Sequence, residues 1–515
     1  MPGHESPKAV RAANVILAGG GLFCLVVLLY VVYRYGLTGK GQFTSHVGPW
    51  VYYLIPAVSS VLLFGSLRLS PSIKINLALV LFSIAITLYS FELILEVVNR
   101  RASRDRQTLW TPTTRQAMDE LVQIARKAGV AYDTRSKFEV VRDLRSADSG
   151  VFPAIIPKAL LAPQTDGTLK SRIMLDGREI LVLGGISNKT TVFCNESGEW
   201  ITYLSDEHGF HNPAGIWNRS DIDVAVLGDS YAHGACVPSG RNSVALIRRR
   251  YPATLNLGML GNGPLMELAQ LKEYVKRLEP KAVLWFFYEE NDFADLKNER
   301  NSPLLMSYLE GPFHQELLDL QPEIDEALED YVAAEIDQVR DSRLPDEGRG
   351  GAEIRTAMQT VVFLGNLRRR LGLAYGALDG PEDHRVVSDE TLDLLTEVFT
   401  VAKATVASWG GDIYLVYVPE RQRYTDPGTA ELDETTRERT LRLARDLDIP
   451  VIDIHSAIQA HDDPLSLFPF RRRGHFNEHG YRLVAESVLE SISHHEEDCL
   501  VLSLPKGTEC KGPMK

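Results

Sequence analysis

The chain has 515 residues, 44% hydrophobic and 24% charged, with a formal net charge of -13. At roughly 100–200 residues per domain this length allows about two to four domains, and the ordinary apolar content excludes a disordered chain. With 39 glycines and 5 cysteines, the chain is neither collagen-like nor a disulfide scaffold. The negative charge argues against nucleic acid as a partner.

Three apolar stretches lie near the N-terminus, at about 12–33, 47–67 and 75–96. The first two contain no charged residue, and the third contains two glutamates. Each is close to the roughly 20 residues that cross a bilayer as a helix, although a buried core helix is the alternative. Aromatic residues near the proposed ends suit a membrane interface: Tyr30, Tyr33, Trp50, Tyr52 and Tyr53. We therefore expect residues 1–98 to be a membrane anchor of three transmembrane helices.

The side of the membrane that holds the large C-terminal part is harder to predict. Basic residues after the third stretch would keep it in the cytoplasm by the positive-inside rule, although long domains translocate largely regardless of charge. Four cysteines outside the anchor suit two disulfides, Cys194–Cys236 and Cys499–Cys510, and four reduced thiols are the alternative. We expect a multi-pass protein of a bacterial inner membrane with an extracytoplasmic C-terminal part.

Two segments separate the anchor from the next domain. Residues 99–149 are polar and helix-like, which indicates a connector. Residues 150–220 alternate short β-prone runs with Gly, Asn, Asp and Pro turns, which predicts a small β-rich segment packed on the domain that follows.

Residues 221–498 change to alternating strand and helix patterns, and 499–515 form a C-terminal tail. The expected strands lie near Val224–Leu227, Leu255–Leu257, Ala282–Phe287, Ile413–Val418 and Val451–Ile454. Strands alternating with helices predict an α/β fold with a parallel sheet covered on both faces. Residues 315–379 interrupt the pattern with charged helical sequence, which we interpret as an inserted cap or lid.

Polar residues follow the strands where a site of a parallel sheet belongs. Ser230 comes after the first strand and could act as nucleophile, with His475 as its base. The amides of Ser230 and Gly261 and the side chain of Asn291 could hold an oxyanion, helped by the dipole of a helix beginning at Ser230. Asp229 is expected to brace the turn rather than to transfer protons.

These residues fall into four blocks that resemble the GDSL/SGNH hydrolase family over about residues 221–493. The blocks are Gly228-Asp229-Ser230, Gly261, Asn291-Asp292 and His475. The resemblance implies a flavodoxin-like α/β/α sheet and a Ser/His esterase mechanism, with Asp229 and Asp292 as supporting residues. No metal ion or other cofactor is implied.

The chain departs from the family pattern at the last block. Arg472 stands three residues before His475, where the family usually has an Asp. The acceptor that orients the histidine could be Asp462, Asp463 or a backbone carbonyl, or a Ser–His dyad could suffice, or activity could be lost. The arginines at 471–473 are either a solvated surface or a clamp for an anionic group.

Two smaller departures accompany it. Tyr231 replaces the usual Leu after the nucleophile. Glu289 and Glu290 replace small residues before Asn291, which we expect to place two carboxylates near the site and to disfavour acidic substrates.

The sequence thus predicts a membrane-anchored serine ester hydrolase acting on an acylated cell-envelope glycan or lipid. One alternative is an acyltransferase that modifies an envelope polysaccharide. The other is a degenerate, non-catalytic module that binds glycan or scaffolds an envelope complex. Oligomeric state cannot be inferred from these features.

Overall fold

The computed structural model describes residues 6–33, 50–104, 115–164, 166–342, 361, 387–425, 427–472 and 474–499. Its contacts divide the chain into two units, and we describe each by itself. One unit contains the three N-terminal helices, and the other contains every later helix and strand whose bounds the structure describes.

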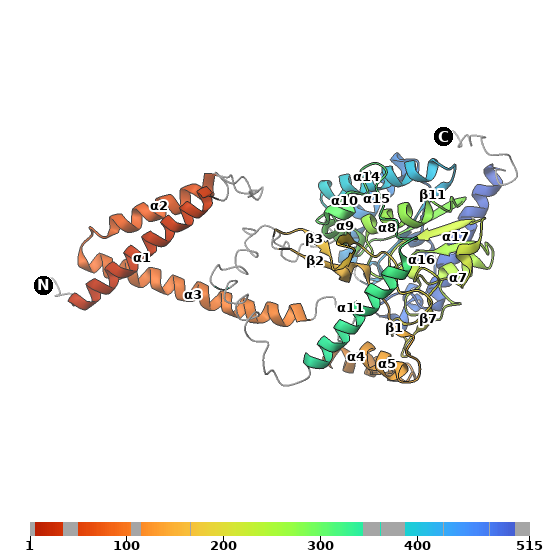
Figure 1. Cartoon of the computed structure of the whole chain (residues 1–515), viewed down its shortest axis with the longest axis horizontal. Helices are drawn as coiled ribbons and strands as arrows, with labels where there is room; N and C mark the ends of the chain where they lie inside the picture. Colours follow the sequence, from red (N-terminus) through yellow and green to blue (C-terminus); the bar gives the residue numbers. More distant parts are fainter. Residues whose placement is uncertain are drawn as a thin grey trace. The chain divides into compact units, whose positions relative to one another are not determined.

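The N-terminal unit consists of helices α1 (Pro7–Val31), α2 (Trp50–Ser66) and α3 (Pro71–Arg104), with α1 packed against both others (Figure 1). Among the described residues, α1 and the Pro71–Leu95 part of α3 are long and apolar enough to cross a membrane. The apolar part of α2, Tyr53–Ser66, is shorter. Two of the three expected helices therefore have the length and apolar composition of a membrane span.

A close contact joins α1 to α2. A Cβ added at Gly21 would lie 3.1 Å from the Phe64 ring, and Ser60 Oγ donates to the Gly21 carbonyl at 3.0 Å. Small residues and side-chain hydroxyls of this kind are common where membrane helices meet. Many large apolar side chains on these helices face outward instead; Val15 is 72% exposed and Val61 is 71% exposed.

The second unit begins with α4 (Arg115–Lys127) and α5 (Lys137–Arg145), followed by short strands. The strands are β1 (Val151–Pro153), β2 (Leu161–Pro163), β3 (Leu169–Ser171), β4 (Ile173–Leu175), β5 (Arg178–Ile180), β6 (Thr190–Val192) and β7 (Thr202–Leu204). β6 lies between β1 and β7, while β2–β3 and β4–β5 are antiparallel pairs. A β-rich segment thus occupies the predicted range.

The large sheet has five parallel strands in the order β12-β11-β10-β8-β9. They are β8 (Val224–Leu227), β9 (Thr254–Asn256), β10 (Ala282–Tyr288), β11 (Asp412–Val418) and β12 (Val451–Asp453). Numbered along this sheet, the order is 2-1-3-4-5, that of flavodoxin-like folds. The strand order reverses between β8 and β10, and ligands of such sheets bind beyond the strand ends at that point.

Helices cover both faces of this sheet, because alternate residues of β8, β10 and β11 enter two different apolar clusters. On one face lie α8 (Pro264–Gln270), α9 (Asp292–Glu299), α10 (Pro303–Met306), α11 (Gln321–Ser342), α14 (Asp389–Ala407) and α15 (Pro427–Asp446). On the other lie α6 (Ser230–His233), α7 (Ser243–Arg248), α16 (Ile454–Gln459) and α17 (Glu478–Cys499) (Figure 1).

The β-rich segment shares the core of the sheet. Ile180 and Val192 belong to the same buried cluster as Trp285 of β10. Ile324 and Leu328 of α11 belong to it as well. The described start of the predicted insertion is therefore packed into the body of the unit and is not a free lid. The rest of the insertion, from residue 343 on, lies outside the described residues except at 361.

Candidate active site

The turn after β8 presents Ser230. Gly228 makes this turn with φ +145°, and a Cβ there would lie 2.8 Å from Phe286 Cβ. The Asp229 side chain accepts a hydrogen bond from the Tyr231 amide and caps α6. α6 is one turn long and ends at Gly234 with φ +79°. Few peptide dipoles are aligned in so short a helix, so the expected contribution of its dipole is small.

His475 lies beside Ser230. Its Nε2 is 2.8 Å from Ser230 Oγ, although the two residues are 245 positions apart in the chain. His475 precedes α17, whose start is capped by Asn477: the Asn477 side chain accepts from the amides of His479 and Gly480. These two hydrogen bonds fix the chain direction immediately after His475.

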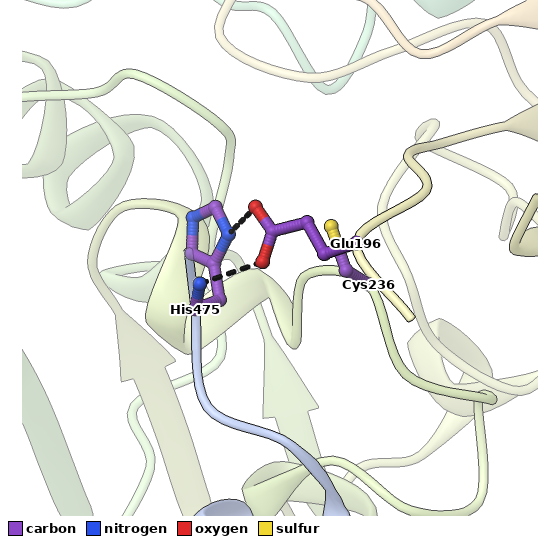
Figure 2. Close-up of side chains that lie close together, drawn as sticks. All are labelled: Glu196, Cys236 and His475. Atoms are coloured by element: carbon purple, nitrogen blue, oxygen red, sulfur yellow. Dashed lines mark hydrogen bonds and ion pairs between the residues drawn. The ribbon is translucent and has the colours of Figure 1, made fainter. Parts of the chain in front are cut away.

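A carboxylate faces the other ring nitrogen of His475. Glu196 Oε1 lies 2.9 Å from His475 Nδ1, and Glu196 Oε2 accepts from the His475 amide at 2.7 Å (Figure 2). Glu196 is in the loop between β6 and β7 of the β-rich segment. Both side chains are largely covered, with 24% of Glu196 and 20% of His475 exposed.

Glu196 was not among the acceptors predicted from the sequence. Asp463, one of those alternatives, instead pairs with Arg471 at 2.7 Å on the surface. Arg472 is exposed and pairs with Glu120 at 3.0 Å. Arg473 lies outside the described residues.

The contacts of His475 define its tautomer. A carboxylate only accepts hydrogen bonds, so Nδ1 carries the proton and Nε2 is left to accept from Ser230. Burial alone would lower the pKa of His475, but the charge of Glu196 and its hydrogen bond outweigh burial and raise it above 6.5. The charges of Asp229 and Glu290 act in the same direction.

The three groups predicted for the oxyanion lie at the carboxyl edge of the sheet. Asn291 follows β10 and its Nδ2 donates to Asp229 Oδ2 at 3.3 Å, which leaves its second N–H available. Gly261 has φ +79°, a conformation that glycine adopts without strain. Among the described residues, neither the Ser230 amide nor the Gly261 amide donates to another protein group.

The two supporting aspartates are buried. Asp229 Oδ2 also lies 3.2 Å from Ser230 Oγ, and burial raises the pKa of Asp229 despite its hydrogen bonds. Asp292 accepts from the Tyr288 amide at 2.8 Å and thereby fixes the turn after β10. Burial, then the nearby Glu267 and Asp229, raise the pKa of Asp292 well above its usual range. Both aspartates are placed to hold backbone and neighbouring side chains.

The expectation for Glu289 is wrong. Its carboxylate is 5% exposed and is bound by Arg423, whose Nε and Nη2 donate at 3.1 and 2.8 Å, and by the hydroxyl of Tyr417. This buried ion pair removes Glu289 as a free charge of the site. Glu290 is exposed and accepts a hydrogen bond from the Tyr288 hydroxyl.

A disulfide lies next to the Glu196–His475 pair. Cys194 and Cys236 are bonded, with their Cα atoms 5.2 Å apart. This confirms one of the two predicted pairings; Cys510 of the other lies outside the described residues. Cys194 is two residues before Glu196, and Cys236 is six residues after Ser230. The predicted disulfide was therefore the signal in the sequence that could have brought Glu196 to the site.

Three potential metal ligands meet here. Ligand atoms of Glu196, Cys236 and His475 lie within 4.8 Å of one another (Figure 2). In the disulfide-bonded protein the Cys236 sulfur is covalently occupied and offers no thiolate. In the oxidised protein the groups that meet here are therefore the Ser230 hydroxyl, the His475 imidazole and the Glu196 carboxylate.

No family model and no curated protein matches the sequence. Among solved structures, the chain is similar to a lipolytic protein of the G-D-S-L family from Desulfitobacterium hafniense DCB-2, with 12% identity and a TM-score of 0.27 over 52% of this chain and 99% of that one. A lipase/acylhydrolase from Enterococcus faecalis has 14% identity and a TM-score of 0.27, covering 53% of this chain and 96% of its own. An alpha/beta hydrolase enzyme from the metagenome of Lake Arreo, Spain, has 17% identity and a TM-score of 0.27, covering 54% and 98%. These values are too low to transfer a function to this chain.

Proposed function

We propose that the chain is a serine ester hydrolase in which Ser230 is the nucleophile, His475 the base and Glu196 the orienting acid. The observation that carries this proposal is the pair of hydrogen-bond contacts through one imidazole. Nε2 faces Ser230 Oγ at 2.8 Å and Nδ1 faces Glu196 at 2.9 Å. A serine hydroxyl becomes a useful nucleophile when such a base accepts its proton.

The steps follow from these contacts. Ser230 Oγ attacks the acyl carbon while its proton passes to His475 Nε2, and Glu196 stabilises the imidazolium that forms. The oxyanion receives hydrogen bonds from the Ser230 and Gly261 amides and the Asn291 side chain. His475 then protonates the leaving alkoxide, which breaks the ester bond and leaves an acyl group on Ser230. Water repeats the sequence: it loses a proton to His475, attacks the acyl carbon and releases the acid and free Ser230.

The missing family Asp does not make the site degenerate in this proposal, because Glu196 supplies a carboxylate to the same ring nitrogen. Transfer to a sugar hydroxyl would use the same acyl-enzyme with a different acceptor. To identify the acyl acceptor, turnover of an acyl donor is measured with water alone and with added saccharide.

We further propose that the N-terminal helices anchor the enzyme in a bacterial inner membrane, with the catalytic unit outside the cytoplasm and an acylated envelope glycan or lipid as substrate. Outward-facing apolar side chains such as Val15 and Val61 support the anchor, because hydrocarbon solvates them better than water. The Cys194–Cys236 disulfide supports an oxidising compartment. A membrane-impermeant maleimide, applied to intact cells before and after reduction, tests the sidedness.

The catalytic proposal is tested on the full chain purified in detergent. We expect a fluorophosphonate probe to label Ser230 and p-nitrophenyl acetate to be hydrolysed. Ser230→Ala should abolish labelling and lower turnover by about 10⁴-fold or more. Equal labelling or equal turnover of the wild type and Ser230→Ala, with both folded by circular dichroism, would contradict the proposal.

A further inference from the structure

We propose that reduction of the Cys194–Cys236 disulfide turns the Glu196–His475 pair into a site for a zinc-like divalent cation, with Cys236 as the third ligand. Metal bound there switches the Ser230–His475 site off. The inhibitory consequence rests on the proposed hydrolase function. The metal site itself rests on the placement of the three side chains.

The placement of the ligand atoms suits a single ion. They all lie within 4.8 Å of one another. Zinc bonds to protein sulfur, nitrogen and oxygen are about 2.0–2.3 Å long, so two donors of one tetrahedral ion are about 3.3–3.8 Å apart. A closure of the three side chains by at most about 1.5 Å is therefore enough to bind one ion.

The ligand types favour zinc over magnesium or calcium. Thiolate, imidazole and carboxylate are the donors that Zn²⁺ takes in proteins, whereas the harder cations prefer oxygen alone. A tetrahedral ion on these three ligands keeps a fourth position for water or for the second oxygen of Glu196. Cys236 is 2% exposed, so its thiolate would be shielded by protein.

The disulfide prevents metal binding at this site in the oxidised protein. Reduction by a thiol or phosphine adds two electrons and two protons, breaks the S–S bond and gives two thiols. A metal ion then displaces the proton of the Cys236 thiol, so binding releases a proton. In the oxidised protein that sulfur is bonded to Cys194, and the third ligand does not exist.

A metal ion bound at this site changes which ring nitrogen of His475 carries the proton. Nδ1 is the ring nitrogen that faces Glu196, and Nε2 is the one that faces Ser230. A metal on Nδ1 takes the place of its proton, and a neutral imidazole then carries its proton on Nε2. With Nε2 protonated, His475 can no longer accept the proton of Ser230.

The test compares Cys194→Ser, which leaves Cys236 as a free thiol, with Cys194→Ser/Cys236→Ser. Both full-length variants have the disulfide removed, so loss of the covalent link is the same in each. They are stripped of metal with EDTA, freed of the chelator, kept in a phosphine reductant and titrated with Zn²⁺ for turnover and with Co²⁺ for absorbance. Co²⁺ bound by a thiolate gives a sulfur-to-cobalt charge-transfer band that does not depend on hydrolase activity.

We expect Cys194→Ser to bind one Co²⁺ with the charge-transfer band and to lose turnover with Zn²⁺. The double variant should lack the band and require at least about 10- to 100-fold more Zn²⁺ for the same inhibition, the size of effect that outer-shell changes alone have on metal affinity. Phosphine-reduced wild type should behave as Cys194→Ser does, and oxidised wild type as the double variant. The comparison of reduced with oxidised wild type tests the same site without any substitution, so it still applies if a variant does not fold.

A thiolate–cobalt band of equal strength in both variants would overturn the site, as would its absence from Cys194→Ser and from reduced wild type. A band without inhibition by Zn²⁺ would overturn the proposed switch. If no form of the chain hydrolyses an ester, the hydrolase proposal fails, while the Co²⁺ titration still decides the metal site.

Discussion

The large parallel sheet and the β-rich segment each contribute to the candidate site, but they position their residues differently. Ser230 and Asn291 follow β8 and β10, which are neighbours in the sheet, so the strand order alone brings them to one edge. Glu196 lies in a loop between two three-residue strands. There the Cys194–Cys236 disulfide ties it to the region of Ser230.

Local hydrogen bonds add to the support of that loop. Tyr132 donates from its hydroxyl to the Asn195 carbonyl at 3.0 Å, and the Asn195 side chain donates to the Asp133 carbonyl at 3.1 Å. The segment before the sheet is therefore a functional part of the site in our proposal. If the loop between β6 and β7 positions His475 through Glu196, changes in this loop should damage catalysis as much as changes at the edge of the sheet.

The largest effect that separates the two regions is expected for Glu196→Gln. The amide of Gln can donate to Nδ1 and stabilise the wrong tautomer, so kcat should fall by about 10³–10⁴-fold. Steady-state kinetics with p-nitrophenyl acetate measures this loss. A reduction of less than tenfold in kcat would show that Ser230 and His475 act as a dyad.

Glu196→Gln should also change the pH dependence of turnover. The base works only when neutral, so turnover of the wild type should fall as the pH drops through the raised pKa of His475. Without the charge of Glu196 that pKa drops, and the acidic limb should move to lower pH. Glu290→Gln is the matched control: Glu290 also raises the pKa of His475 by its charge, but it is exposed. We expect it to shift the limb in the same direction with little loss of maximal rate.

Asn291→Ala tests the contribution of the sheet edge. Removal of one oxyanion donor costs about 10²–10³-fold in kcat, with KM nearly unchanged because the donor acts on the transition state. Fluorophosphonate labelling should slow, since that reaction also places negative charge on an oxygen. A change confined to KM would instead assign Asn291 to substrate binding.

Gly474→Ala tests the approach of Glu196 to His475 without replacing any of the three proposed catalytic residues. Gly474 has φ +106°, and a Cβ there would overlap Glu196 Oε2. Displacement of the carboxylate by about 1 Å can cost about 10²-fold in rate. Gly410→Ala is the control for backbone strain, because Gly410 has φ +80° and nothing within 4 Å of an added Cβ. Similar kcat in both variants would argue against a positioning effect of Gly474.

The sequence predicted the sheet well because its strands are continuous apolar runs between turn residues, such as Ala282–Tyr288, and these runs are needed to bury both faces. Ser230 and Asn291 could be named because they follow β8 and β10, and the edge at which parallel strands end is fixed by chain direction. His475 could be named only from the resemblance of its sequence block. Glu196 could not, because its loop is positioned by short strands and a disulfide, both long-range features. The role of Glu289 was missed for a related reason: its partner Arg423 is 134 residues away, and only the packed structure brings the two together.

Substitution of Arg472 is expected to have the smallest effect on kcat, in contrast to substitution of Glu196. It occupies the position of the family aspartate, yet its side chain is 60% exposed and pairs with Glu120, which is 63% exposed. An exposed pair of this kind contributes little to stability, and His475 Nδ1 already has its acceptor. Arg472→Ala should therefore change kcat by less than about twofold, within what ordinary surface substitutions do. A loss comparable to that of Glu196→Gln would mean that the region around Arg472, and not the β-rich segment, controls the histidine.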